Sequence, residues 1–257
     1  MIERKLFLYI IFGMERKCVK LFGFDIDSFN FEEAIDYALE LINTKKGGQV
    51  ITINPEMIEN ALVNKTFADV LNQAELVVPD GIGIKIGLKI KGENVDRIAG
   101  VEFAHELLNR CSQNKIPVAF VGARPHVVLS AVKNLKAKFD NLKIVYYQNG
   151  YFSDEQRVLK ELRQKSPKLV LVALGSPKQE NFIKQARELL PASLFIGVGG
   201  SFDVWSGEVQ RAPKIYQNLG LEWLYRTVKE PKRFKRIFPT IPRFLLNVIK
   251  KEVFKIS

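Results

Sequence analysis

The sequence predicts an α/β protein whose mostly parallel, doubly wound sheet carries helices on both faces. Short apolar runs alternate along the chain with longer amphipathic stretches, and most of the apolar runs end at Gly, Pro or Asn. Six of the apolar runs are expected to be strands: Val50–Ile53, Leu76–Val78, Val118–Val121, Lys143–Tyr147, Leu169–Leu174 and Leu194–Val198. Strands that alternate with helices in this order pair in parallel, because each connection has to cross the sheet.

Six stretches between and before these strands have apolar residues at helical spacing. They are expected to be the helices Phe31–Ile42, Pro55–Asn72, Val101–Gln113, His126–Phe139, Asp154–Gln164 and Gln179–Leu189. Ahead of them, the alternating run FGFDIDSF reads as an early strand or hairpin. We therefore expect one catalytic core, residues 21–210, preceded by an N-terminal extension, residues 1–20, and followed by a basic helical appendage, residues 211–257.

Composition excludes several classes of protein. The chain has 257 residues, of which 47% are hydrophobic and 26% charged, so it can bury a core. The two cysteines predict no disulfide framework and favour a reducing, cytosolic setting. The two histidines, His105 and His126, are isolated and are expected to serve packing or capping, so no zinc cluster is predicted. The apolar run Leu6–Phe12 is too short to span a bilayer and precedes charged residues instead of a cleavage site, so Met14 could be the natural start.

Positive charge is concentrated at the C-terminus. From residue 211 onward there are twelve Lys or Arg and three Glu, which accounts for +9 of the net charge of +11. Such a segment predicts a polyanionic partner: nucleic acid, the diphosphate of a nucleotide, or an anionic membrane. Arg226, Arg233 and Arg236 recur at helical spacing, although Pro231 should bend or interrupt the helix. The basic amphipathic stretch that Pro242 opens fits either a membrane interface or a helix packed on the core.

Polar residues follow the expected strands, and ligands in such sheets bind beyond the carboxyl ends of the strands. Asp80, held between Pro79 and Gly81, fits a general base with a raised proton affinity, but an Asx-turn is the more usual role of such an aspartate. Thr52 and Asn54 follow the first core strand and could merely cap the next helix.

Three further sequence features extend the same rim. Arg97 precedes a helix, and Gln179 stands in a first helical turn. Gly199 and Gly200 belong to a G-x-G-G run that lacks the third glycine of a dinucleotide fingerprint and follows the last strand instead of the first. An oxidoreductase is therefore not expected, and these glycines instead allow the backbone to approach a ligand closely.

An ordered set of motifs resembles the WecG/TagA/CpsF glycosyltransferases from about Leu21 to Arg236. The motifs are TINPE (Thr52–Glu56), VPDG (Val78–Gly81), RIAG (Arg97–Gly100), NGYF (Asn149–Phe152), LGSPKQE (Leu174–Glu180), GVGGSFD (Gly197–Asp203), RAP (Arg211–Pro213) and LEWLYR (Leu221–Arg226). The resemblance implies a Rossmann-like core and an inverting transfer of an N-acetylmannosamine-type sugar. The donor would be a UDP-sugar and the acceptor undecaprenyl-diphosphate-linked N-acetylglucosamine, in wall teichoic acid or other surface polysaccharide synthesis.

The same resemblance implies roles for particular residues. Asp80 would be the catalytic base, Thr52 and Asn54 would line the pocket, and Arg97 and Gln179 would contact substrate. Arg226, Arg233 and Arg236 would belong to an appendage that neutralises the diphosphate. No cofactor or metal requirement is implied, so the Asp25-Ile26-Asp27 run, which has the D-x-D form of metal-dependent glycosyltransferases, is expected to be structural.

The implied location is cytoplasmic and peripheral, on the inner face of the plasma membrane, with a homo-oligomer possible and no nucleic-acid partner. Ile53, Glu102 and Lys232 depart from the residues usual in the family, and Glu102 could alter the choice of sugar. Family members that use other UDP-sugars, such as the mannosaminuronic acid or glucose, remain an alternative. A non-catalytic basic protein that binds nucleic acid or membrane is a more distant one.

Overall fold

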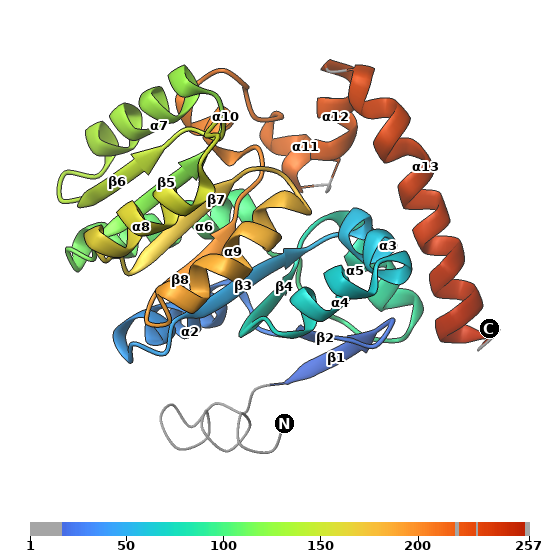
Figure 1. The fold of residues 1–257 in the computed structure, drawn as a ribbon. Helices are drawn as coiled ribbons and strands as arrows, with labels where there is room; N and C mark the ends of the chain where they lie inside the picture. Colours follow the sequence, from blue (N-terminus) through green and yellow to red (C-terminus); the bar gives the residue numbers. More distant parts are fainter. Residues whose placement is uncertain (1–16, 219–220, 230, 255–257) are drawn as a thin grey trace.

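The computed structural model describes residues 17–218, 221–229 and 231–254 and shows an α/β fold. A six-stranded parallel sheet has the order β4-β3-β8-β7-β5-β6, and helices cover both of its faces (Figure 1). Its strands are β3 (Gly48–Ile53), β4 (Leu76–Pro79), β5 (Val118–Gly122), β6 (Ile144–Gln148), β7 (Leu169–Ala173) and β8 (Leu194–Gly197). The predicted fold class and all six expected strands are therefore confirmed.

The chain fills the sheet in two directions. From β3 it first builds outward to β4, then crosses to β5 and β6 and returns through β7 to β8, which pairs with both β7 and β3. The direction in which strands are added reverses at β3, and doubly wound sheets bind ligands in the crevice at such a reversal. The carboxyl ends of β4, β3, β8 and β7 consequently share one edge of the sheet.

Two layers of helices bury the sheet. The helices between residues 31 and 206 are α2 (Phe31–Asn43), α3 (Pro55–Val63), α4 (Lys65–Asn72), α5 (Ile82–Ile90), α6 (Gly100–Gln113), α7 (Pro125–Lys138), α8 (Glu155–Lys165), α9 (Lys178–Leu189) and α10 (Ser201–Ser206). The core on one face draws on α2, α6, α7 and α10. On the other face α3, α4 and α5 pack over one half of the sheet, and α8 and α9 over the other half.

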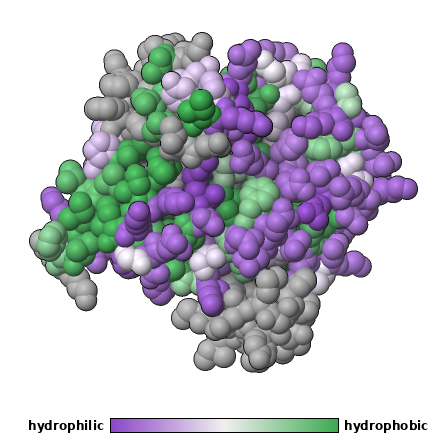
Figure 2. Space-filling model, turned by 180° about the vertical axis from the view of Figure 1, so that it is seen from behind, coloured by the Kyte–Doolittle hydropathy of each residue, from purple (hydrophilic) through white to green (hydrophobic). Residues whose placement is uncertain are grey.

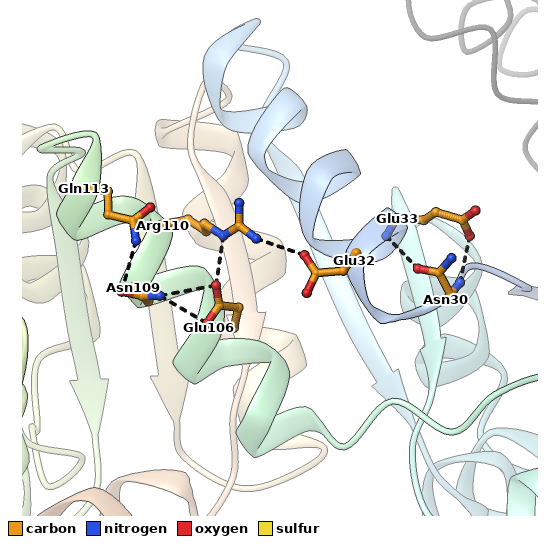
Figure 3. Close-up of polar contacts among 7 residues, drawn as sticks. All are labelled: Asn30, Glu32, Glu33, Glu106, Asn109, Arg110 and Gln113. Atoms are coloured by element: carbon orange, nitrogen blue, oxygen red, sulfur yellow. Dashed lines mark hydrogen bonds and ion pairs between the residues drawn. The ribbon is translucent and has the colours of Figure 1, made fainter.

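Hydrogen bonds at the helix ends explain where α2 begins and how it meets α6. Asn30 caps α2 by accepting from the backbone N–H of Glu33, and the Glu33 carboxylate accepts from the backbone N–H of Asn30 (Figure 3). Arg110 on α6 donates to Glu106 on its own helix and to Glu32 on α2, at 2.8 and 2.9 Å. The two neighbouring helices are thereby joined at their surface.

The D-x-D run lies in a hairpin, as expected. β1 (Cys18–Leu21) and β2 (Phe24–Asp27) pair antiparallel. Asp27 is fully buried, and its Oδ2 accepts from the backbone N–H of Val77 on the edge strand β4, at 2.8 Å. Asp25 pairs with Lys20 on the surface. Asp27 thus attaches the hairpin to the sheet, and the structural interpretation of this run is confirmed.

One predicted helix is divided in the structure, and another helix was not predicted. The expected helix Pro55–Asn72 is divided at Asn64, whose extended backbone ends α3 and whose side chain caps α4 by accepting from the N–H of Phe67. The helix α5 was not predicted at all, because its sequence, IGIKIGLKI, alternates like a strand and contains glycine. Phe244 lies where a Cβ on Gly87 would meet its ring at 3.0 Å, so tertiary packing favours this helix over its local propensity.

The C-terminal segment forms α11 (Lys214–Asn218), α12 (Glu222–Lys229), α13 (Pro231–Asn247) and the π-helical turn η1 (Val248–Val253). The prediction that a helix opens at Pro242 was wrong, because α13 begins at Pro231 and continues through Pro239 and Pro242. It runs along α3 and α5 (Figure 1), with Phe244 fully buried, and Val248 at the start of η1 is fully buried too.

Of the two alternatives for the terminal helix, packing on the core is therefore the one observed along this face. The division of the chain at residues 20 and 210 stays a prediction, and residues 1–16 lie outside the described part. Among the described residues, no helix has the length and apolar character needed to cross a bilayer.

Candidate active site

A cavity of about 660 Å³ opens at the shared carboxyl ends of β3, β4, β7 and β8. Seven residues predicted from the sequence line it: Thr52, Asn54, Asp80, Arg97, Gln179, Gly199 and Gly200. Six of them come from the ends of four strands that are far apart in the chain, and the parallel sheet brings these ends to one edge; Arg97 comes from the segment between α5 and α6. The sequence-based expectation that these residues face one crevice is confirmed, while their chemical roles stay predictions.

Asp80 follows β4 directly, and its position is fixed by backbone contacts. Its own N–H donates to the carbonyl of Ile53 at 2.8 Å, which continues the pairing of β4 with β3. Gly81 then turns the chain with a φ of 80°, a conformation that glycine adopts without strain. The Asp80 carboxylate accepts from the backbone N–H groups of Gly100 and Gly81. The side chain thus does make a local turn contact, and it also lines the cavity.

Burial raises the pKa of Asp80 above its ordinary value of 3.8. The backbone hydrogen bond from Gly100 and the positive charge of Arg97 oppose this rise in pKa, while the negative charge of Glu222 adds to it. A carboxylate with an increased proton affinity, placed in a cavity, can take a proton from a hydroxyl group. The environment therefore fits the general base that the motif implies.

Arg97 lies between the sheet and the C-terminal helices. Its Nη2 donates to the backbone carbonyl of Gln217 on α11 at 3.1 Å. Thr52 packs so closely against Gly100 that a Cβ on residue 100 would meet the threonine side chain at 3.0 Å. The cavity wall beside Asp80 is therefore closely packed, and any side chain at residue 100 would displace it.

Asn54 caps α3, because its Oδ1 accepts from the backbone N–H of Met57 at 3.0 Å. The sequence left open whether Asn54 caps the next helix, and the structure confirms that it does. The residue nevertheless lines the cavity, and its side-chain amide group has donors that the cap does not use.

Gln179 is buried over the end of β8. Its Oε1 accepts from the backbone N–H of Gly199 at 3.2 Å, and its Nε2 donates to Glu180 at 2.8 Å. A Cβ at Gly197 would lie 2.4 Å from this Nε2, so glycine is required for the amide to sit there. The G-x-G-G run consequently makes room for a side chain as well as allowing a close backbone approach.

The C-terminal helices reach the cavity through Glu222 on α12, which lines it. Arg211 donates to Glu222 and to Glu102 on α6, both at 3.0 Å, and so joins α12 to the core. Glu102, one of the family departures, is therefore a structural contact of this bridge. Arg226 belongs to α12, and Arg233 and Arg236 belong to α13, but their side chains lie outside the described part of the structure.

Three lining carboxylates, Glu56, Glu180 and Glu222, had no role assigned from the sequence. They stand within the motifs TINPE, LGSPKQE and LEWLYR. An acidic residue immediately after Gln179 in a strand-end motif was the available signal for Glu180. No three His, Cys, Asp or Glu residues of the described ranges gather as a candidate metal set.

The fold and this strand-end site are compatible with a glycosyltransferase, and the family match identifies the chain as one. Residues 19–257 match the Glycosyl transferase WecG/TagA/CpsF family, and the chain belongs to it, which confirms the resemblance read from the motifs. Two relatives from Bacillus are named N-acetylglucosaminyldiphosphoundecaprenol N-acetyl-beta-D-mannosaminyltransferase. The chain is 38% identical to the Bacillus spizizenii protein over 212 residues, which cover 82% of each chain. It is also 38% identical to the Bacillus subtilis protein over 225 residues, which cover 87% of this chain and 88% of the relative.

Proposed function

We propose that this protein transfers N-acetylmannosamine from a UDP-linked donor to undecaprenyl-diphosphate-linked N-acetylglucosamine, with inversion at the anomeric carbon. Family membership and the two similar transferases support the reaction class and the acceptor. The observation that carries the proposal is the position of Asp80, a carboxylate of raised pKa in a cavity that Arg97 and the glycine-rich turn also line.

In the proposed reaction, Asp80 accepts the proton of the attacking acceptor hydroxyl. The hydroxyl oxygen forms a bond to the anomeric carbon of the donor sugar from the face opposite the diphosphate, and the bond from that carbon to the diphosphate oxygen breaks. UDP leaves with the bonding electron pair. The cavity supports this step because it is large enough to bring a bound substrate next to the base.

The departing diphosphate gains negative charge, which the site has to stabilise. Arg97 is one cationic group that lines the cavity, and Gly200, in the glycine-rich turn after β8, lines it at the same edge of the sheet. We propose that Arg226, Arg233 and Arg236, on the two helices beyond the cavity, supply the remaining positive charge. In this proposal α12 and α13 complete the active site when the substrate binds.

A polyprenyl acceptor implies contact with a membrane surface. Apolar side chains gather on the left of the face seen in Figure 2, where α5 and the C-terminal helices lie once Figure 1 is turned. Exposed apolar residues there are accompanied by exposed lysines: Ile86, Ile90, Leu246, Val253 and Phe254, with Lys89, Lys250 and Lys251. This combination fits the headgroup region of an anionic bilayer, and we propose that the protein is peripheral on the inner face of the plasma membrane.

A transfer assay with a short-chain polyprenyl-diphosphate-linked N-acetylglucosamine tests the function. Among UDP-linked N-acetylmannosamine, its uronic acid, glucose and N-acetylglucosamine, the first is expected to be the best donor. If none of these donors gives transfer above background, the proposed function is wrong. If a donor other than UDP-linked N-acetylmannosamine is preferred, the reaction class stands and the assigned donor sugar changes. Short DNA, added to a thermal-shift series with UDP, tests the distant alternative of a nucleic-acid-binding protein.

The base assignment has its own variant. Asp80→Asn is expected to lower kcat by about 100- to 10,000-fold, because the amide cannot accept the proton. Since only ionised Asp80 is active, and burial raises its pKa above 3.8, the wild-type rate should rise with pH through that raised pKa. Asp96→Asn is a matched control, because Asp96 is a highly exposed neighbour of Arg97 in the sequence. Near-normal turnover of Asp80→Asn would remove Asp80 from the mechanism.

A further inference from the structure

Asn60 is a polar residue of α3 that lines the cavity and to which the proposed reaction assigns no task. It stands in the interior of the helix, one turn after Glu56, and Glu56 and Met57 line the cavity beside it. Asparagine is a poor helix former, because its short amide competes for nearby backbone groups. An asparagine inside a helix therefore calls for a reason that lies outside the helix.

The side-chain amide of Asn60 is available to a ligand. Among the described residues it has no hydrogen-bond partner, and it does not bond to the carbonyl of Glu56 four residues earlier, as a polar side chain inside a helix can. The residue is partly exposed, and it is exposed toward a cavity that it lines. Its two N–H donors and its carbonyl acceptor are consequently all unused.

The cavity is lined from both faces of the sheet. Arg97 is followed by Ile98, which belongs to the core on the face that α2 and α6 cover, whereas Met57 belongs to the core under α3, α4 and α5. Asp80 follows β4 at the sheet edge between these two faces. The backbones of Asn60 and Arg97 therefore flank the strand end that carries Asp80 from different faces of the sheet.

The proposed displacement uses these two sides differently, because the attacking hydroxyl and the departing diphosphate stand on opposite sides of the anomeric carbon. Since Arg97 is assigned to the diphosphate, the acceptor sugar has to approach from the other side, where α3 lies. The helix α13, whose end carries part of the proposed membrane surface, packs on α3 through Arg243 and Asn247, which bind Glu59 at 2.7 and 2.9 Å. Thus α3 connects the cavity with the surface at which a lipid-linked acceptor would arrive.

We propose that Asn60 binds the acetamido group of the acceptor N-acetylglucosamine and so determines acceptor specificity. The two amides are complementary, because the N–H of Asn60 can donate to the acetamido carbonyl and its carbonyl can accept from the acetamido N–H. Met57, which lines the cavity beside Asn60, offers the acetamido methyl group an apolar contact. This inference rests on the proposed function, because it requires N-acetylglucosamine as the acceptor sugar.

Initial rates with two acceptors test the proposal on the full-length protein. N-acetylglucosamine and glucose, each linked through diphosphate to the same short polyprenyl chain, differ only in the substituent at C2. The wild type is expected to prefer the first acceptor by about 10- to 100-fold in kcat/KM, as one or two hydrogen bonds between uncharged groups allow. Asn60→Ala should reduce this preference to about threefold or less, through a rise of about tenfold in the KM for the N-acetylglucosamine acceptor.

Donor kinetics are needed as well, because an N-acetylmannosamine donor also carries an acetamido group. Asn60→Ala should leave the KM for the UDP-sugar and the dissociation constant of UDP unchanged. A variant that loses affinity for the UDP-sugar but keeps the acceptor preference overturns the assignment to the acceptor. Asn72→Ala is the matched control, because it makes the same substitution on the exposed surface of α4, outside the cavity, and should behave as the wild type with both substrates.

Thermal unfolding without ligand separates binding from a structural role. Alanine has the higher helix propensity and Asn60 has no hydrogen bond to lose among the described residues, so Asn60→Ala is expected to melt at or above the temperature of the wild type. A clearly lower melting temperature overturns the proposal. Wild-type protein that transfers sugar to neither acceptor removes the proposed function together with this inference. Wild-type transfer without an acceptor preference, or a preference that Asn60→Ala retains in full, removes this inference alone.

Discussion

Phe244 is the side chain through which the C-terminal helix is attached to the core. It is fully buried, meets the ring of Phe22 edge-on with the ring centroids 5.8 Å apart, and lies over Gly87 on α5. Truncation of a buried phenylalanine to alanine typically costs about 3–5 kcal/mol through lost transfer free energy and the cavity that remains. We expect Phe244→Ala to lower the free energy of unfolding by about 4 kcal/mol.

Other contacts of the helix are not removed by this substitution. Arg243 and Asn247 both bind Glu59 on α3, at 2.7 and 2.9 Å, and Glu252 pairs with Lys91 at 2.6 Å. These polar contacts can hold the helix near the core, but they do not fill the cavity under Phe244. The variant should therefore fold, with reduced protection of α13 amides against hydrogen exchange.

Equilibrium unfolding in urea measures the effect. Leu246→Ala is the matched control, because Leu246 lies on the same helix with 56% of its surface exposed, and it should change stability by less than about 0.5 kcal/mol. If the arginines of α12 and α13 bind the diphosphate, Phe244→Ala should also reduce sugar transfer. A loss below about 1 kcal/mol, or a loss equal to that of the control, would show that α13 is not attached through this side chain.

Three further substitutions test other parts of the structure. Asp27→Asn should destabilise the protein by about 1.5–3 kcal/mol in urea unfolding, because it weakens a buried charged hydrogen bond, whereas Asp25→Asn on the surface should be nearly neutral. Gly197→Ala should lower transfer at least tenfold while the protein stays folded by circular dichroism, because the new methyl group displaces the amide of Gln179. Burial raises the pKa of Glu40 above 4.5, so the stability that its carboxyl group contributes is complete below pH 4.5 and is lost as pH rises through the raised pKa. Glu40→Gln should therefore be more stable than the wild type in urea at neutral pH, with a difference that shrinks toward pH 4.5, and a constant difference would contradict this reasoning.

Much of the site could be predicted because parallel sheets place strand ends together. Asp80, Asn54 and Gln179 were recognised as polar residues directly after apolar runs, and the structure brings all three to one cavity. Sequence could not decide between capping and binding for Asn54, since the same amide can do both. The motif that contains Glu180 indicated its place at a strand end, but its burial could not be predicted, because burial depends on the packing of α9 against β8.

The sequence by itself determined the alternation of strands and helices, the order of the motifs and the concentration of positive charge at the C-terminus. These properties follow from side-chain chemistry and from spacing along the chain. Tertiary structure alone decided that IGIKIGLKI is a helix, that α13 passes through two prolines, and that Asp27 holds a hairpin. In each case contacts between residues far apart in the chain decide the outcome, and local sequence patterns do not contain them: Phe244 packs on Gly87 of α5, and Asp27 accepts from the backbone N–H of Val77.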